Sequence, residues 1–315
     1  MSKGLVLYFH RENDGAMFER IIIALKQRYQ LVSLPVLEEL MLNKGNLDRI
    51  CHISFDDGDQ SFYHIVFPVL KKHGVPVSLF LSPEILVSRG NYWFQEVNDY
   101  EEDLMRQIIS TYYGLPVSRL EPFSIKDIIK QLPYSVISHL ISTYRLEKKY
   151  EPKPPYNMSL AEVLEVENSG LVTIGAHSLH HPILQNEDDQ NSLSEIRGSL
   201  HGLQQLLGHP VRYFAYPNGI PDIDFGEREI NYLRDNGVTM AFSTELDHIS
   251  PGVNMLSIPR MGFPRMGLSP SNPLIYFRLS LGKKWINIKT SGSTSEKRIR
   301  EKLKLLFRKT LPKLY

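Results

Sequence analysis

Residues 50–58 read Ile50-Cys-His-Ile-Ser-Phe-Asp-Asp-Gly58, an apolar run that ends in two carboxylates and a glycine. The run over 50–55 predicts a β-strand. In α/β sheets and barrels, functional sites form at the carboxyl ends of strands, where Asp56 and Asp57 lie. Neighbouring side chains on an extended segment point apart, so one carboxylate could bind a metal ion while the other reaches a water molecule. On its own, the segment could equally be a turn with two solvated acids.

A second polar segment, Gly175-Ala-His-Ser-Leu-His-His-Pro182, follows a strand predicted over 172–175. His177 and His181 are four residues apart and would converge on one ion if the segment made a helical turn, although His180 is a competing partner for His177. A carboxylate with two neutral imidazoles leaves coordination positions open on Zn²⁺ or a similar divalent ion. The histidines therefore indicate a catalytic rather than a structural metal site.

A third segment, Val211-Arg-Tyr-Phe-Ala-Tyr-Pro-Asn-Gly219, contains a strand predicted over 211–216 and closes on Pro-Asn-Gly. Backbone N–H groups at such a strand end could hold an oxyanion, which makes Tyr216 and Asn218 candidates for contact with a substrate. Taken alone, the segment would pass as an ordinary junction between a strand and a turn.

Short apolar runs alternate with helical patterns along most of the chain, which is typical of a parallel sheet with covering helices. Residues 91–167 interrupt the alternation, and we interpret them as a helical insertion between barrel elements rather than a separate domain. Further strands are predicted over 5–9, 75–81, 240–243 and 255–258, and helices over 16–29, 61–73, 101–112, 124–132, 135–144, 160–168, 194–207 and 227–236.

The length and composition suit one large domain or two small ones, because 42% of the 315 residues are apolar. The single cysteine, Cys51, excludes a disulfide framework and a cysteine-based zinc site, and it fits a reducing compartment. No stretch approaches the ~18 apolar residues needed to cross a bilayer, and the apolar run within residues 1–10 is too short for a secretory signal. We therefore expect a soluble cytoplasmic protein.

The C-terminal residues 281–315 are strongly basic. They contain eleven lysines and arginines against two acids, a net charge of +9, so the remaining 280 residues carry −8. Residues 291–295 have the composition of a flexible linker, and apolar residues from Ile299 to Phe307 recur at helical spacing, which predicts a tethered amphipathic helix. Its charged face suits anionic lipid headgroups at the inner face of a membrane, with docking on the acidic body as the alternative. The tail lacks interleaved aromatic residues, so we expect no nucleic-acid binding.

Together, the three polar segments resemble the polysaccharide deacetylase family of carbohydrate esterases, relatives of the nodulation chitooligosaccharide deacetylases. The matching motifs are Ser54-Phe-Asp-Asp-Gly58, His177-Ser-Leu-His-His-Pro182 and Phe214-Ala-Tyr-Pro-Asn-Gly219, in that order. The resemblance covers residues 3–90 and 170–262. It implies a distorted (β/α) barrel, commonly of seven parallel strands, here over residues 1–280 and followed by the basic tail. It also implies a hydrolase that removes an N-acyl group, first of all acetyl, from an amino sugar in a polysaccharide or a lipid-linked glycan precursor.

The resemblance also implies a role for each polar residue. Asp56 would be the catalytic base, and Asp57, His177 and His181 would hold one divalent metal ion, zinc first, with cobalt or nickel as alternatives. His181 rather than His180 is the implied ligand because it is the one followed by proline. The ion would lower the pKa of a bound water and polarise the amide carbonyl, while Asp56 takes the proton of the water. The ion and a backbone N–H of the third segment would stabilise the oxyanion.

Two departures limit the match. Many family members protonate the leaving amine with the histidine of a C-terminal Leu-x-His motif, but the corresponding stretch here reads Leu256-Ser-Ile-Pro-Arg260. His10, which ends the first predicted strand, resembles instead the general acid of an exopolysaccharide subgroup whose barrel is circularly permuted; a structural histidine is the alternative. The arginine that usually orients the base is also absent before the proline of the third motif, which leaves Arg212 and Arg260 as candidate substitutes.

Two other functions are compatible with the motifs. A deformylase or other amidohydrolase acting on a lipid-linked sugar would use the same chemistry, and the size of the acyl pocket would decide between them. A non-catalytic glycan-binding relative is the third candidate, but binding alone does not require a base and three metal ligands. The insertion should shape the substrate cleft, where Tyr92, Trp93 and Phe94 could stack on a sugar ring, although buried packing is the stronger expectation for Trp93.

Overall fold

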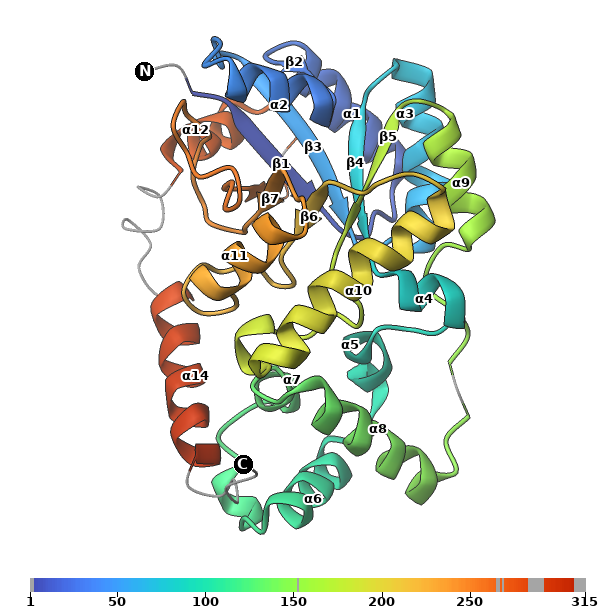
Figure 1. The fold of residues 1–315 in the computed structure, drawn as a ribbon, viewed down its shortest axis with the longest axis vertical. Coiled ribbons are helices and arrows are strands. Elements are labelled where there is room, and N and C mark those ends of the chain that lie inside the picture. The colour runs from blue at the N-terminus through green and yellow to red at the C-terminus, as the bar shows by residue number, and fades with distance from the viewer. Residues whose placement is uncertain (1–2, 152, 265–266, 268, 283–291, 309–315) are drawn as a thin grey trace.

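A curved parallel sheet forms the centre of the protein (Figure 1). The computed structural model describes residues 3–151, 153–264, 267, 269–282 and 292–308. The strands follow the order β7-β6-β5-β4-β3-β1-β8, with β2 paired to β3, and the paired strands are parallel. This arrangement confirms the predicted distorted (β/α) barrel. The strands are β1 (Leu5–Phe9), β2 (Gln30–Leu31), β3 (Ile50–Asp56), β4 (Val77–Leu81), β5 (Val172–Ala176), β6 (Tyr213–Ala215), β7 (Met240–Phe242) and β8 (Met261–Gly262).

One short segment connects the two ends of this sheet. Ile258 forms a parallel bridge with Phe242 of β7, and three residues later Met261 pairs with Leu7 of β1. The strand predicted over 255–258 is therefore displaced to β8. Pro259 explains the displacement, because it cannot donate a hydrogen bond to a neighbouring strand.

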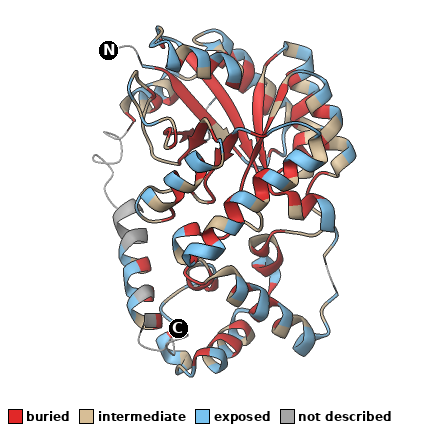
Figure 2. Cartoon of the chain, in the orientation of Figure 1, coloured by how far each residue is buried: buried red, intermediate tan, exposed pale blue. Residues whose placement is uncertain are grey.

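Amphipathic helices cover the outside of the sheet, and the strands between them are almost entirely buried (Figure 2). Their ends carry ordinary capping signals: Ser159 and Glu162 form a capping box at the start of α9, and Gly74 ends α3 in the left-handed conformation. The covering helices are α1 (Gly15–Lys26), α2 (Leu34–Leu42), α3 (Phe67–His73), α4 (Pro83–Ser88), α9 (Leu160–Asn168), α10 (Asp189–Leu207), α11 (Glu227–Asp235) and α12 (Pro273–Leu281).

The helix predicted over 61–73 differs from the expectation. It begins as a π-helical turn over Phe62–Val66 and becomes α-helical only at Phe67. Pro68 lacks an N–H, and its ring clashes with the carbonyl group of the preceding turn, so a regular α-helix cannot continue through this position.

The helical insertion lies between β4 and β5 and has a hydrophobic cluster of its own. Its main helices are α5 (Trp93–Glu96), α6 (Glu102–Tyr113), α7 (Ile125–Ile129) and α8 (Tyr134–Lys148). Helix α9 was included in the predicted insertion over 91–167, but Val163 and Val166 belong to the core of the barrel. The separately packed part of the insertion is therefore shorter than predicted.

The basic C-terminal helix, α14 (Gly292–Arg308), packs against the insertion (Figure 1). Leu303 and Phe307 are buried there, and the ring of Phe307 lies 4.7 Å from that of Tyr113. The expectation of a tethered, unpacked tail is therefore wrong, because the apolar side of the helix packs against the insertion. Residues 292–295, predicted as a linker, form the start of the helix, while 283–291 and 309–315 lie outside the described residues.

Packing of the tail also bears on the predicted membrane contact. The apolar side of α14 faces protein, so contact with a membrane surface stays a prediction that rests on its charged side alone. Among the described residues, the helices are too short or too polar to span a bilayer.

Candidate metal and catalytic site

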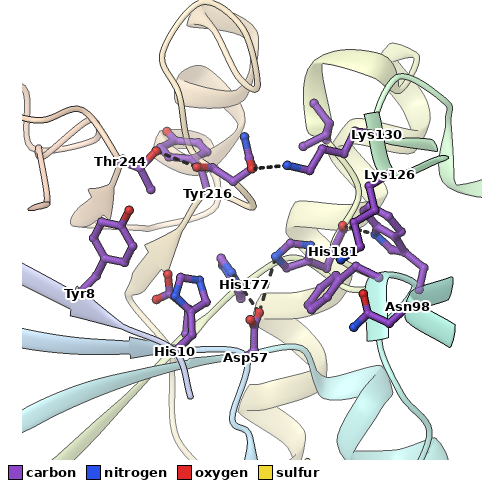
Figure 3. A pocket seen from close by; sticks show the side chains of 15 residues that line it. Tyr8, His10, Asp57, Asn98, Lys126, Lys130, His177, His181, Tyr216 and Thr244 are labelled. Atoms are coloured by element: carbon purple, nitrogen blue, oxygen red, sulfur yellow. Dashed lines mark hydrogen bonds and ion pairs between the residues drawn. The ribbon is translucent and has the colours of Figure 1, made fainter. Parts of the chain in front are cut away.

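Apart from the two candidate arginines, the predicted site residues line one pocket of about 370 Å³ at the carboxyl ends of the central strands (Figure 3). Strands β1, β3 and β5 each deliver residues at or just beyond their last position, as expected for a parallel sheet. The insertion supplies the opposite wall. The lining residues are Tyr8, His10, Asp56, Asp57, Trp93, Phe94, Asn98, Lys126, Lys130, His177, His181, Ile183, Tyr216, Asn218 and Thr244.

Asp57, His177 and His181 form a buried group whose potential ligand atoms all lie within 4.8 Å of one another. The Nε2 atoms of both histidines lie 3.6 Å from Oδ1 of Asp57. Nδ1 of His177 lies 2.7 Å from the carbonyl oxygen of Ala215, so this nitrogen carries the proton and Nε2 presents its lone pair to the centre of the group.

The donor set fits a divalent cation. Oδ1 of Asp57 is buried and has no hydrogen-bond partner among the described residues, which would be costly for a carboxylate without a cation beside it. Burial raises the pKa of Asp57, whereas burial and the neighbouring His177 lower the pKa of His181. A carboxylate with two neutral imidazoles is the donor set of open, catalytic zinc sites.

The backbone adopts unusual conformations to bring these ligands together. Asp57, Ser178 and His181 have φ values of 71°, 59° and 61°, in the left-handed region that side-chain-bearing residues rarely occupy. The expected helical turn between His177 and His181 is therefore absent, and an irregular turn brings the two rings to 4.7 Å. Strain of this kind is concentrated at functional sites.

His180, the competing candidate, points away from the group. Its Nδ1 lies 2.6 Å from Oε1 of Glu195, and its ring stacks on Tyr134 at 4.3 Å. The backbone N–H groups of Leu179 and His180 also donate to Glu195. His180 thus holds the loop in place and does not join the ligand group.

Asp56 faces a different partner from Asp57. Nη1 and Nη2 of Arg260 donate to its two carboxylate oxygens at 2.8 and 2.9 Å, and both side chains are buried. Burial alone would raise the pKa of Asp56, but the charges of Arg260, His177 and His10 outweigh it and lower the pKa to about 2. Of the two candidate arginines, only Arg260 makes this contact; Arg212 is exposed and precedes β6, at the end opposite the pocket.

The Pro-Asn-Gly segment contributes Asn218, with φ of 59°. Its side-chain Nδ2 donates to Asp224 at 2.6 Å, and its carbonyl oxygen accepts from Oγ1 of Thr244 at 2.7 Å. The backbone N–H of Asn218 donates no hydrogen bond within the described residues, so it is available to a ligand. Tyr216 differs from the expectation, because its N–H donates to Phe242 and its hydroxyl to Leu256. Tyr216 therefore lines the pocket and has no donor left for an oxyanion.

His10 follows the last residue of β1 and lines the pocket together with both aspartates. Its ring lies 5.6 Å from that of Tyr8, edge to face, and the side chain is exposed. The position is suitable for a group that exchanges protons with both substrate and solvent.

Aromatic residues at the start of the insertion support the ligands, a role that the sequence did not suggest. The hydroxyl of Tyr92 donates to the carbonyl oxygen of Asp57 at 3.1 Å, and Nε1 of Trp93 donates to that of His181 at 2.8 Å. The ring of Phe94 lies 4.9 Å from that of His181. Tyr92 and Trp93 are buried, so of the three only Phe94 presents a partly exposed ring to a sugar.

The fold and the site define a (β/α) barrel with a candidate metal centre at the carboxyl ends of its strands. The model of the polysaccharide deacetylase family matches residues 124–241. The matched region contains the histidine and Pro-Asn-Gly segments but not the strand that carries Asp56 and Asp57. The predicted resemblance to this family is confirmed over that region, and the predicted class of enzyme, a hydrolase acting on an amide bond, is the class of the matched family.

Solved structures of deacetylases share the fold. The Streptococcus pyogenes deacetylase PplD, in complex with acetate, is 16% identical with a TM-score of 0.57, covering 86% of this chain and 96% of that one. IcaB from Ammonifex degensii is 18% identical with a TM-score of 0.58, covering 89% and 98%. A de-N-acetylase from Aggregatibacter actinomycetemcomitans is 16% identical with a TM-score of 0.54, covering 82% and 94%. No protein with a curated description matches the sequence.

Proposed function

We propose that the protein is a metal-dependent N-deacetylase of an amino sugar within a glycan. The observation that carries the proposal is the buried group of Asp57, His177 and His181 beside a carboxylate, Asp56, that is held by an arginine. The match to the polysaccharide deacetylase model over residues 124–241 and the names of the similar structures, which include a de-N-acetylase, support the same reaction.

Asp57, His177 and His181 would hold the metal ion. When bound, such an ion lowers the pKa of a coordinated water and polarises the amide carbonyl. The chain supplies the three positions through one carboxylate and two Nε2 atoms, a set that leaves room for water and substrate.

Asp56 is the proposed base. Arg260 keeps it ionised at neutral pH and fixes its plane, while each carboxylate oxygen retains a second lone pair that can accept a proton from water. The rigid contact means that the base is already oriented before substrate binds, which reduces the reorganisation needed in the transition state.

Asn218 and His10 complete the proposed reaction. The N–H of Asn218 would donate to the carbonyl oxygen as negative charge develops on it. His10, on the exposed side of the pocket, would donate a proton to the nitrogen of the leaving amine. The products are then acetate and a free amino sugar.

Metal analysis and acetate release test the proposal. The purified protein should hold close to one zinc, cobalt or nickel ion per chain, and Asp57→Ala and His181→Ala should lose both the ion and acetate release from N-acetylated oligosaccharides. His180→Ala is the matched control and should retain the ion, because His180 binds Glu195 instead. A wild-type protein that stays metal-free after reconstitution would rule out the proposed chemistry.

A further inference from the structure

Two lysines of the insertion line the pocket, and the proposed reaction does not use them. Lys126 lies on α7 and Lys130 directly follows it, four residues later, so the two side chains leave the same face of the helix. Figure 3 shows both on the side of the pocket that carries His181. Nζ of Lys130 contacts Oδ1 of Asn218.

This pair of cations is not neutralised by protein. Like charges four residues apart on a helix repel each other and destabilise it. Neither ammonium group has an ion-pair partner within the described parts of the chain, and the ammonium group of Lys130 makes a long contact, 3.4 Å, to Oδ1 of Asn218. The two positive charges therefore line the pocket without a carboxylate in direct ion-pair contact with either of them.

The position of the pair is nevertheless well defined. Nδ2 of Asn186 donates to the carbonyl oxygen of Lys130 at 2.7 Å, which ties the end of α7 to the loop that follows the histidine segment. Ser124 caps the start of the same helix. The lysines are thus held over the pocket by contacts from both the insertion and the barrel.

We infer that the substrate carries an anionic group, a phosphate or a carboxylate, close to the N-acylated sugar, and that Lys126 and Lys130 bind it. This inference rests on the proposed function and adds the class of glycan. Lysine acts as a point charge, and two ammonium groups one helical turn apart can share the oxygens of one anion.

The different burial of the ligand group and the two lysines indicates the orientation in which such a substrate would bind. The ligand group is buried, whereas Lys130 is half-buried and Lys126 is exposed. The acyl group would enter toward Asp57, the sugar ring would lie near Phe94, and the anionic group would remain near the pocket entrance. Two cations at the entrance would also speed the association of an anionic substrate.

The test compares matched N-acetylated oligosaccharides that are neutral, carry one phosphate ester, or carry one carboxylate. With the metal-bound protein, kcat/KM is measured by acetate release, and Kd is measured by calorimetry for any substrate that is not turned over. We expect the better anionic substrate to exceed the neutral one by about tenfold, as for a charge-assisted contact. A preference for the phosphorylated or for the carboxylated oligosaccharide identifies which anionic group the two lysines bind.

Variants connect this preference to the two lysines. Lys126→Gln with Lys130→Gln should lower the ratio of anionic to neutral substrate by about tenfold, and Lys126→Arg with Lys130→Arg should retain it. Lys148→Ala is the control, because this lysine lies on α8 of the same insertion, pairs with Glu101 and does not line the pocket.

Equal binding of neutral and anionic glycans by the wild type would overturn the inference, as would a preference that survives in the double glutamine variant. Failure of the proposed function has a different signature: no acetate is released from any substrate, yet the Kd values still report whether the lysines select an anion.

Discussion

Asp56 and Asp57 are adjacent in the chain but have opposite electrostatic surroundings. Asp56 ends β3 and meets the guanidinium of Arg260, whereas Asp57 turns into a left-handed conformation and faces two histidines. One carboxylate therefore has its countercharge within the protein, and the other has an oxygen without a partner among the described residues. This asymmetry separates the proposed base from the proposed metal ligand.

Removing Arg260 should be strongly destabilising. Arg260→Gln leaves the buried carboxylate of Asp56 without its cation, which costs roughly 3–5 kcal/mol of unfolding free energy. Urea denaturation at neutral pH measures the loss. Arg212→Gln, at the exposed candidate position, should change the same quantity by less than about 0.5 kcal/mol. If the additional change Asp56→Asn recovered none of the lost stability, the buried ion pair would not be its cause.

Candidate site residues could be located from the sequence only where a motif is local. The segments around Asp57, His177 and Asn218 each lie within a few residues, so strand ends and spacing marked them as candidates, and the family resemblance supplied their proposed roles. The choice between Arg212 and Arg260 could not be made, because Arg260 meets Asp56 across 204 positions of sequence. The lysines of α7 gave no signal at all, since only the folded insertion brings them to the pocket.

At the scale of elements, the contact between the insertion and the barrel includes a buried carboxylate. Oε1 of Glu187 accepts a hydrogen bond from the N–H of Tyr134 at 2.7 Å, at the start of α8. Burial raises the pKa of Glu187 from 4.5 to about 7, although the bond from Tyr134 opposes the shift. The folded protein therefore holds this proton more tightly than the unfolded chain does.

Stability should consequently decrease as the pH rises from about 4.5 through 7, because ionised Glu187 is penalised only in the folded state. Glu187→Gln keeps the acceptor and removes the charge, so it should be more stable than the wild type by up to roughly 3 kcal/mol at pH 8 and equal to it near pH 4. Thermal unfolding at both pH values measures the difference. Glu121→Gln, at an exposed position, controls for the lost charge, and an identical gain there would contradict the assignment.

Element positions were predictable where one local signal dominated. β1 and α9 have the predicted bounds because each has a local signal, a short buried apolar run in β1 and a capping box at the start of α9. The last strand and the helix over 61–73 were misplaced at Pro259 and Pro68, where a missing N–H changes the local structure. Docking of α14 on the acidic body was only an alternative, and its packing on the insertion was not predicted, because the apolar stripe does not reveal which surface it covers.

At the scale of the whole molecule, α14 links the end of the chain to the insertion and to the pocket. Leu303 and Phe307 pack on the insertion, and Arg300 pairs with Asp224, which in turn accepts a hydrogen bond from Asn218. Helix, insertion and pocket loop should therefore lose stability together.

Leu303→Ala and Phe307→Ala should each destabilise the protein by roughly 2–5 kcal/mol, since both side chains are buried. Leu305→Ala, on the same helix but 60% exposed, should have little effect. Chemical denaturation measures the change in unfolding free energy of each variant, and limited proteolysis reports whether the insertion has become more accessible. Equal, small effects for all three variants would show that α14 does not pack on the insertion in solution.

The connection between β7 and β1 through residues 258–262 has a consequence for synthesis on the ribosome. Asp56 emerges early, whereas its partner Arg260 is translated 204 residues later. Until Arg260 is synthesised, closing the barrel would bury the carboxylate of Asp56 without its cation. This electrostatic cost opposes closure of the early strands. Closure of the barrel and formation of the Asp56–Arg260 pair thus become one late event of biosynthesis, and a ribosome-bound fragment that ends before Arg260 should not close its barrel.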